Sequence, residues 1–361
     1  MTREYAYDFA VFVGRFQPLH IGHQHVIERA LEQAQTLIIL IGSADSARSI
    51  QNPFTYEERR RLIETCYRHE IATGRIVVAG VSDRYYNDDR WIADIQRIVR
   101  AMVLEIGNHG GVGLHGTADF KVGLAGYKKD GSSYYLKMFP DWGAIDVPSQ
   151  YGTFNSTDIR NQYFRRSPVL PHDICSPEVV EILKEFRLRP EFSALVGERE
   201  FMDEYKASWA GSPFPPVFVT VDAVTVQSGH VLLVRRGQQP GKGLFAIPGG
   251  FVHPNETLRD SAVRELKEET MISDGKGEIP PAMLRSFIDE KATRVFDYPN
   301  RSIRGRVITH AFLFRCPDRR TMFKVKGADD AASAAWYRLG DLEPSEFFED
   351  HWSILTEMIG L

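Results

Sequence analysis

The sequence predicts an α/β protein of two domains, the first with a parallel sheet and the second an α/β/α sandwich with a mixed sheet. Three observations support this fold class. Strand-like and helix-like segments alternate through the first half, a proline-rich segment follows, and a hairpin pattern begins directly after it. A length of 361 residues suits two domains of ordinary size. We predict a first domain over 1–190, with bracing helices to about 210, and a second over 211–361.

The first half alternates apolar runs of strand length with amphipathic stretches of helix length. Such alternation is typical of a doubly wound parallel sheet, because each crossover between parallel strands needs a connecting helix. Two later helical stretches, 177–187 and 190–209, carry no motif and are expected to brace the domain. The predicted strands are 9–13, 37–41, 76–81 and 112–116, and the predicted helices are 23–35, 56–68, 89–105 and 156–165.

A proline-rich segment, 211–216, is the predicted linker between the domains. Clustered prolines stop helices and stiffen short connections. After it, 217–226 and 231–234 read as two strands of a hairpin joined by a short turn. Further strands, a carboxylate-rich helix and a C-terminal helix complete the second domain.

Composition excludes several classes of protein. With 43% hydrophobic and 25% charged residues, both domains can build a core. The net charge of −4 argues against a nucleic-acid partner, and the basic run 59–61 is expected to decorate a helix that begins with a capping box at Thr55 and Glu58. The three cysteines have no paired spacing, so we expect neither disulfides nor a zinc site.

No apolar run approaches the roughly 18–20 residues of a membrane span, and the N-terminus is polar. We therefore expect a cytoplasmic protein with no membrane partner. Assembly into a homo-oligomer stays open.

Residues 250–272 place carboxylates at the spacing of a metal-binding helix. Helical residues three and four apart share a face, so Glu265, Glu268 and Glu269 are expected to converge. Oxygen ligands favour Mg²⁺, with Mn²⁺ possible, over zinc. Such an ion neutralises diphosphate oxygens and activates the attacking water. The stretch resembles the Nudix box, and its motif residues here are Gly250, Glu256, Arg264, Glu265, Glu268 and Glu269.

Two details of this helix are open to test. Arg264 precedes Glu268 by one turn and is expected to orient a carboxylate, with Glu256 as a further partner. Met271 stands where the Nudix pattern has glycine, so the helix either runs one residue longer or ends in a strained turn. The general base is unresolved, and Asp329 and Asp330 are better explained as turn residues than as the base.

A second chemistry lies near the N-terminus, where 8–23 read as strand, glycine turn and helix. This arrangement aims backbone N–H groups and a helix N-terminus at phosphates. His20 and His23 can donate hydrogen bonds to oxygens that gain charge as pyrophosphate leaves, and Arg15 adds a cation. A His-x-x-His spacing alone is usually structural. Together with 14–18 (Gly-Arg-Phe-Gln-Pro), it resembles the HxGH motif of nucleotidyltransferases.

A second segment, 155–160 (Asn-Ser-Thr-Asp-Ile-Arg), supports this assignment. Asn155 or Ser156 would cap a short helix whose N–H groups face an anion, with Arg160 one turn in. It resembles the SxTxIR-type motif that pairs with HxGH in adenylyltransferases. The predicted ATP- or phosphate-binding residues are Gly14, Phe16, Gln17, Lys129, Ser156 and Thr157.

Polar and aromatic residues after the predicted strand 76–81 are candidates for the acceptor site. Open α/β sheets bind ligands at the carboxyl ends of their strands. Trp91 could stack on a flat cationic ring, or belong to the core, and Asn87 could pair with a carboxamide. Asp83 belongs to the same segment. Lys129 lies in a turn that could offer cations to a phosphate or be only solvated.

The combination of motifs resembles one family, the bacterial nicotinamide-mononucleotide adenylyltransferases fused to a Nudix ADP-ribose pyrophosphatase. The resemblance extends from the HxGH segment through 215–223 and the Nudix box to 304–310. It implies a Rossmann-like nucleotidyltransferase domain followed by a Nudix domain. It also implies synthesis of NAD from ATP and nicotinamide mononucleotide (NMN), and hydrolysis of ADP-ribose to AMP and ribose 5-phosphate. Without the resemblance, the residues predict only nucleotidyl transfer and Nudix hydrolysis. Two alternatives therefore stay open: that the first domain transfers to another phosphate acceptor, and that the Nudix domain senses a nucleotide and does not hydrolyse it.

Overall fold

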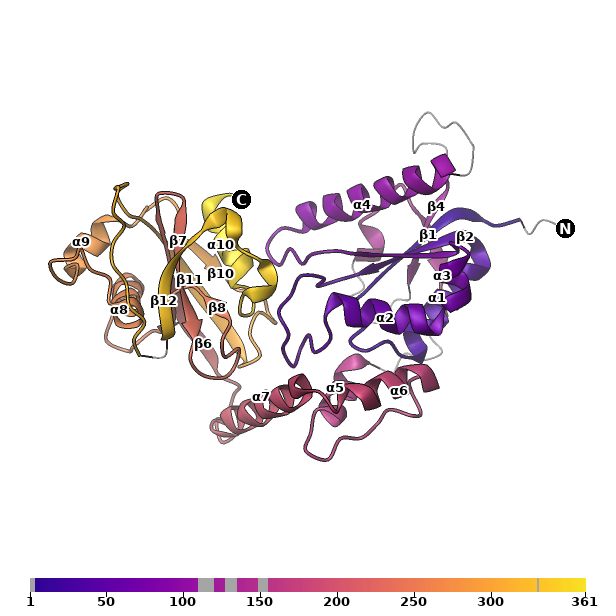
Figure 1. Cartoon of the computed structure of the whole chain (residues 1–361), viewed down its shortest axis with the longest axis horizontal. Helices are drawn as coiled ribbons and strands as arrows, with labels where there is room; N and C mark the ends of the chain where they lie inside the picture. Colours follow the sequence, from indigo (N-terminus) through magenta and orange to yellow (C-terminus); the bar gives the residue numbers. More distant parts are fainter. Residues whose placement is uncertain (1–3, 110–119, 127–134, 149–154, 330) are drawn as a thin grey trace. The chain divides into compact units, whose positions relative to one another are not determined.

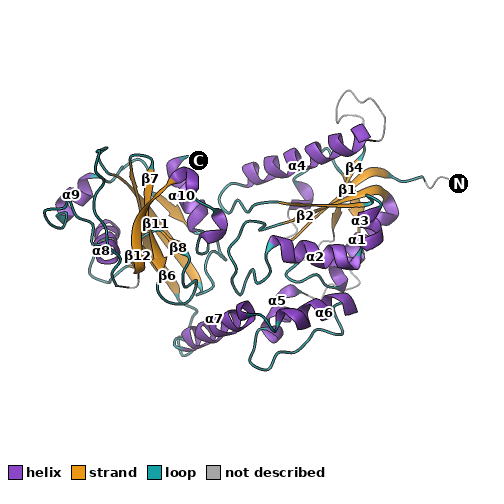
Figure 2. Cartoon of the chain, in the orientation of Figure 1, coloured by secondary structure: helices purple, strands orange, loops and turns teal. Residues whose placement is uncertain are grey.

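The computed structural model describes residues 4–109, 120–126, 135–148, 155–329 and 331–361. The chain divides into two compact units, Met1–Val196 and Gly197–Leu361. This division falls inside helix α7 (Pro190–Ala207), ahead of the segment 211–216 that we predict as the linker. The elements are labelled in Figure 1 and coloured by type in Figure 2.

The first unit holds a five-stranded sheet in the order β3-β2-β1-β4-β5, and all four pairings are parallel. The parallel sheet predicted for this half is confirmed. The strands are β1 (Tyr7–Gly14), β2 (Ala34–Ile41), β3 (Ile76–Gly80), β4 (Val122–Gly126) and β5 (Gly143–Asp146). The helices are α1 (Ile21–Gln33), α2 (Tyr56–Cys66), α3 (Arg68–Ala72), α4 (Asp88–His109), α5 (Ser156–Tyr163) and α6 (Pro177–Phe186).

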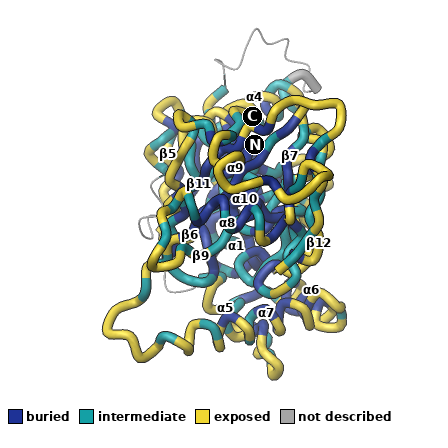
Figure 3. The backbone as a smooth tube through the Cα atoms, turned by 90° about the vertical axis from the view of Figure 1, so that its left-hand side faces the viewer, coloured by how far each residue is buried: buried dark blue, intermediate teal, exposed yellow. Residues whose placement is uncertain are grey.

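Alternate residues of β1 build two cores, one on each face of the sheet. Ala10 and Phe12 pack with α1, α2 and α6, whereas Phe9 and Val11 pack with α4. Side chains of a strand point alternately to its two faces, so one apolar run serves both layers. The helices cover both faces in Figure 1. The middle of β1 and most of β2 are buried, the class that Figure 3 draws in dark blue.

Two strands of this unit, β4 and β5, were not predicted. Both are short and contain glycine, which weakens the strand pattern. The predicted strand at 112–116 lies outside the described residues. The capping box of α2 is confirmed, with Thr55 accepting from the Glu58 N–H and Glu58 from the Thr55 N–H.

The second unit holds a mixed sheet in the order β10-β11-β6-β7-β12, with β8 paired to β7 and β9 to β6. The predicted hairpin is confirmed, because β6 and β7 pair antiparallel across Ser228 and Gly229, both at positive φ. β11 joins β6 in parallel, which makes the sheet mixed. The strands are β6 (Val217–Gln227), β7 (His230–Arg236), β8 (Phe245–Ala246), β9 (Gly249–Phe251), β10 (Arg294–Phe296), β11 (Arg306–Arg315) and β12 (Ala331–Arg338).

Helices lie on both faces of this sheet (Figure 1). Ala262, Val263 and Leu266 of α8 (Leu258–Thr270) form a core with Val221 and Leu232 of the sheet. The other elements are α9 (Pro281–Ser286), α10 (His351–Ile359) and two 3-10 turns, Leu339–Asp341 and Pro344–Glu346. In the part of the chain that the structure describes, no helix is long and apolar enough to cross a membrane.

Candidate active sites

The strand order of the first unit reverses at β1, which has β2 on one side and β4 on the other. Open parallel sheets bind ligands at such a switch point, outside the carboxyl ends of the strands. The segment that follows β1 carries Arg15, His20 and His23, so the predicted transfer residues lie at this edge.

His20 and His23 lie against each other at the start of α1. Their ring centroids are 3.8 Å apart with 29° between the ring planes. His20 is the N-cap of α1, and its Nδ1 accepts a hydrogen bond of 3.1 Å from the Gly22 N–H. This bond fixes the orientation of the His20 ring and leaves a proton, when the ring is neutral, on its other nitrogen.

Three of the predicted phosphate-binding residues, Gly14, Phe16 and Gln17, shape the loop around these histidines. The Phe16 ring is fully buried, and its centroid lies 4.9 Å from that of His23. A Cβ on Gly14 would lie 2.8 Å from the Phe16 ring, so this close approach requires glycine. The buried Gln17 side chain exchanges two hydrogen bonds of 2.9 Å with the backbone of Phe54.

Hydrogen bonds bring the second motif, at the start of α5, to the same loop. Arg160 donates from Nη1 to the Gln17 carbonyl at 2.9 Å and from Nη2 to Thr157 Oγ1 at 3.0 Å. Ser156 Oγ donates to the Pro18 carbonyl at 3.3 Å. Asn155 caps the helix by accepting from the Asp158 N–H. The two motifs, more than 130 residues apart in sequence, therefore lie next to each other.

The site is positively charged and partly desolvated. Burial lowers the pKa of Arg160 to about 10, and the nearby Arg15 cation adds to this shift. Arg15 donates to the Gln51 carbonyl at 3.0 Å and to the Asn52 side chain. Two cations held close together favour a ligand with several negative charges, such as a polyphosphate.

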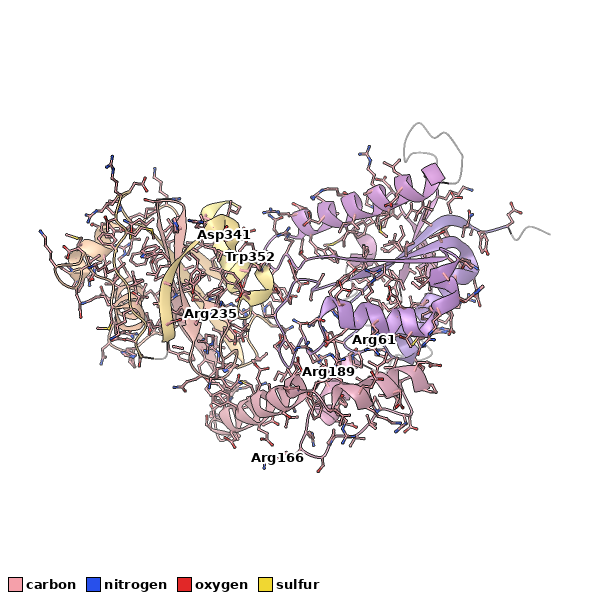
Figure 4. All side chains as sticks on the ribbon, in the orientation of Figure 1. Arg61, Arg166, Arg189, Arg235, Asp341 and Trp352 are labelled. Carbon is pink, nitrogen blue, oxygen red and sulfur yellow. The ribbon has the colours of Figure 1, made fainter. Side chains whose placement is uncertain are left out.

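A buried arginine that sequence analysis misjudged stabilises the same edge. Arg59 was expected to decorate α2, and that expectation is wrong, because the residue is 1% exposed. Its guanidinium donates to the carbonyls of Arg15, Gly42 and Ser43 at 2.9, 2.5 and 2.9 Å. Burial lowers its pKa to about 10. Arg61, labelled in Figure 4, does lie at the surface and pairs with Glu185.

The predicted acceptor residues cluster after β3. Asp83 accepts hydrogen bonds from Tyr85 at 3.1 Å and Ser46 at 3.5 Å. Asn87 accepts from the Arg90 N–H at 2.9 Å, and thereby holds the first turn of α4. Trp91 is half-buried against the α4 core and contacts Tyr135 edge to face. Lys129 lies outside the described residues.

In the second unit Arg264 connects the carboxylates of the Nudix-like helix. It donates to Glu256 at 2.8 and 3.0 Å, to Glu265 at 2.7 Å and to Glu268 at 2.9 Å. The hydrogen bonds from Arg264 lower the pKa of Glu256 to about 2. Burial raises the pKa of Glu265, against the opposing effect of Arg264.

Two backbone contacts place this helix against β9. The Gly249 N–H donates to Glu269 at 3.0 Å. A Cβ on Gly250 would lie 2.5 Å from the Glu265 carboxylate, so only glycine allows this approach. The Glu269 side chain is thus bonded to β9, while those of Glu265 and Glu268 both accept hydrogen bonds from Arg264.

The donor set suits a hard divalent cation, because Glu265, Glu268 and Glu269 offer carboxylate oxygens on one helix. Among the described residues, no three His, Cys, Asp or Glu side chains are gathered closely enough to hold an ion. Metal binding would therefore require these side chains to reorient.

Met271 ends α8 in the left-handed region, at φ 42° and ψ 40°. Of the two alternatives drawn from the sequence, the strained turn is the one observed. Asp329, a candidate base, also has positive φ, at 52°, and adds to the rise in the Glu265 pKa. Asp330 lies outside the described residues.

A cavity of about 250 Å³ is lined by Glu269 together with Arg301, Asp222 and His351, three residues that were not predicted. Arg301 and Asp350 form a buried ion pair at 2.8 Å. Asp222 accepts from Thr309 at 2.6 Å, and burial raises its pKa to about 6. His351 Nδ1 accepts from the Ile247 N–H at 3.1 Å, and burial lowers its pKa. These residues lie far from the Nudix box in sequence, so no local spacing indicates them.

Comparisons with known proteins match both units. The NUDIX domain family matches residues 216–358, and the cytidylyltransferase-like family matches residues 11–94. A nicotinamide/nicotinic acid mononucleotide adenylyltransferase from Acinetobacter baylyi is 35% identical over 51% of this chain and 88% of its own length. An ADP-ribose pyrophosphatase from Methanocaldococcus jannaschii is 34% identical over 38% of this chain and 71% of its own.

Solved structures from Francisella tularensis match both units together. One of them is a bifunctional NMN adenylyltransferase/ADP-ribose pyrophosphatase complexed with AMP and a manganese ion. The match has a TM-score of 0.85 and 32% identity, and covers 98% of this chain and 99% of the other.

Proposed function

The chain belongs to the family of bifunctional NMN adenylyltransferases/ADP-ribose pyrophosphatases, and on that premise we propose which residues carry each reaction. The first activity transfers AMP from ATP to NMN and gives NAD and pyrophosphate. The second hydrolyses ADP-ribose to AMP and ribose 5-phosphate. The assignments of residues, metal and domain boundaries below are our proposals.

For adenylyl transfer, we propose that the phosphate of NMN attacks the α-phosphorus of ATP in line, with no protein nucleophile. His20, His23, Arg15 and Arg160 stabilise the charge that develops on the leaving pyrophosphate. The observation that carries this proposal is the pair of hydrogen bonds from α5 to the carbonyls of 17 and 18, which gather both motifs at one edge. Gly14, Phe16 and Gln17 fix the conformation of the loop after β1. Ser156 and Thr157 lie in the first turn of α5 and are proposed to contact the ATP phosphates.

For the acceptor, Asp83, Asn87 and Trp91 are the proposed nicotinamide-nucleotide residues. They follow β3 and begin α4, at the same carboxyl edge of the sheet. Trp91 is half-buried against the α4 core, and we propose that the exposed part of its ring stacks on the nicotinamide. Lys129 is proposed as a further phosphate contact.

For hydrolysis, Glu265, Glu268 and Glu269 would hold a divalent metal, which polarises the diphosphate and activates water. Arg264 orients Glu265 and Glu268 by direct hydrogen bonds, and Glu256 fixes Arg264 from the other side. Because the proposed ligands are carboxylate oxygens, we propose Mg²⁺ as the resident ion. The Francisella relative is complexed with a manganese ion, so we propose that Mn²⁺ can replace it.

The proposed partners are ATP, NMN, NAD and ADP-ribose, with neither nucleic acid nor membrane among them. We propose a cytoplasmic location and leave the oligomeric state, monomer or homo-oligomer, undecided. The domain boundaries stay as predicted, 1–190 with bracing helices to about 210, then 211–361.

The test is to assay the whole chain with ATP and a panel of acceptors: NMN, nicotinic acid mononucleotide, flavin mononucleotide and phosphopantetheine. We expect pyrophosphate release with NMN above the other classes of acceptor, and AMP release from ADP-ribose with Mg²⁺. Faster transfer to a flavin or pantetheine phosphate would contradict the acceptor. Tight binding of ADP-ribose without turnover would favour the sensing alternative.

A further inference from the structure

The cavity beside the Nudix-like carboxylates has a wall that the matched NUDIX segment does not supply. That segment begins at residue 216, whereas Phe201 and Tyr205 of α7 line the cavity together with Phe251, Arg304 and Glu269. Both residues belong to the second compact unit, which begins at Gly197. The cavity is therefore completed by a helix that precedes the recognised domain.

The C-terminal half of α7 is fixed to the second unit by buried contacts. The buried Glu198 accepts a hydrogen bond of 3.2 Å from the Gly241 N–H, and Met202, one turn later, is 1% exposed. Farther along, the Trp209 ring packs edge to face on Phe218 of β6, with centroids 5.2 Å apart. A helix that only linked two domains would have no reason to bury an acidic side chain.

The adjoining face of the helix presents aromatic rings to the cavity. Phe201 and Tyr205 lie on successive turns, with only 12° between their ring planes. Phe201 is 37% exposed, which is high for a phenylalanine that faces a cavity. The Arg304 guanidinium lies 5.5 Å from the centroid of Phe251, and it also acts on the pKa of Tyr205, opposing the rise caused by burial. Flat apolar rings thus lie next to a cation, the pair of features that a base and its phosphates need.

We infer that Phe201 and Tyr205 bind the base of the nucleoside diphosphate substrate by stacking, so that α7 is part of the hydrolase site. This inference rests on the proposed hydrolysis of ADP-ribose. The carboxylates act on the diphosphate and the α7 rings on the base, so loss of the rings weakens substrate binding and leaves the chemical step in place.

The experiment compares Phe201→Ala and Tyr205→Ala in the full chain with wild type. We expect each to raise the KM for ADP-ribose roughly 5- to 100-fold, the usual effect of losing one stacking ring, with kcat within about twofold. Phe214→Ala is the matched control, because Phe214 is 78% exposed and does not line the cavity. Adenylyl transfer should be unchanged in all three variants.

Unchanged KM in both α7 variants, with wild-type hydrolysis intact, would overturn the inference and leave the proposed function standing. A fall in kcat alone would also overturn it, because that indicates a disturbed fold or metal site. If wild type itself fails to hydrolyse ADP-ribose, the proposed function fails, and calorimetric titration with AMP then decides the inference. Loss of one AMP site in the α7 variants but not in Phe214→Ala supports it, and identical isotherms refute it.

Discussion

Both proposed sites bind phosphate groups, but the charged side chains of the two proposed motifs have opposite signs. At the transfer site, Arg15 and Arg160 are cations held by backbone carbonyls and polar side chains, beside two imidazoles. At the hydrolase site, three carboxylates surround the single guanidinium of Arg264. The first arrangement can receive a polyphosphate directly. In the second, the carboxylate cluster repels phosphate until a divalent cation is bound, so the two activities should respond to different substitutions.

The largest expected effect is on hydrolysis. Glu268→Gln or Glu269→Gln should lower kcat for ADP-ribose roughly a thousandfold, because a bound metal supplies several kcal/mol of stabilisation. We expect Mg²⁺ to raise the Tm of wild type but not that of these variants, and NAD synthesis to be unchanged. The measurements are ADP-ribose turnover and melting with and without Mg²⁺.

Glu278→Gln serves as the control, because Glu278 is exposed and pairs only with Lys267 among the ion pairs described. If both Nudix-helix variants keep full turnover and the same response to Mg²⁺, these glutamates are only a solvated helix face. The hydrolase site would then have no metal-binding carboxylates, and the proposed difference in charge between the two sites would be wrong.

A smaller loss is expected at the transfer site. His23→Ala and His20→Asn should each lower adenylyl transfer about 10²–10³-fold, the usual effect of removing a donor to a developing charge. Asparagine at 20 can still cap α1, whereas His20→Ala would also cost about 1 kcal/mol of helix stability. Pyrophosphate release at saturating ATP measures the effect, and ADP-ribose hydrolysis in the same sample reports the fold. Near-wild-type transfer in both variants would refute the assignment of the histidines.

The buried floor of the hydrolase cavity should give a pH-dependent difference. Asp222 has a folded-state pKa of about 6, above its ordinary value of 3.8 because of burial. Its contribution to stability is full below about pH 4 and is lost as the pH rises through 6. Asp222→Asn has no such loss, so its stability relative to wild type should rise between pH 4 and 7, by up to about 3 kcal/mol.

Urea unfolding of both proteins at several pH values measures this difference. The comparison with wild type is needed because His351, whose pKa is lowered by burial, destabilises the fold as the pH falls below about 6.5. A difference that does not change with pH would mean that Asp222 keeps its ordinary pKa.

The smallest effect concerns the turn at Met271. Met271→Gly should stabilise the protein by about 1 kcal/mol, because glycine adopts φ 42° without the steric cost that a Cβ carries. Met271→Ala keeps the Cβ and is the control. A loss of stability in the glycine variant would show that the half-exposed Met271 side chain contributes more by packing than its backbone costs.

The sequence predicted most of this fold, because long apolar runs and helix caps are local signals. The separate strands and helices of the parallel sheet, the two strands of the β6–β7 hairpin and the capping box at Thr55 were each predicted from short stretches of sequence. The predicted site residues were chosen in the same way, from fixed spacings. Their roles remain predictions, although hydrogen bonds do bring the two transfer motifs together.

Local sequence patterns did not predict features that depend on contacts between residues far apart in the sequence. From the sequence, Arg59 was predicted to be one of three surface arginines. Its guanidinium instead donates hydrogen bonds to carbonyls of residues 16 to 44 positions away. Asp222 and Thr309 lie on neighbouring strands but 87 positions apart. The short strands β4 and β5 are stabilised by their neighbours in the sheet and not by their own sequence.

The carbonyls of Arg15, Gly42 and Ser43, to which Arg59 donates, have a consequence for motion at the transfer site. One guanidinium from α2 fastens the ends of β1 and β2, and the Gly42 N–H also donates to the Gly14 carbonyl at 2.9 Å. If either loop opened alone, the buried Arg59 guanidinium would lose acceptors for its N–H groups, which costs free energy. Their amide hydrogens should therefore exchange with solvent deuterium together with those of α2, as one cooperative unit.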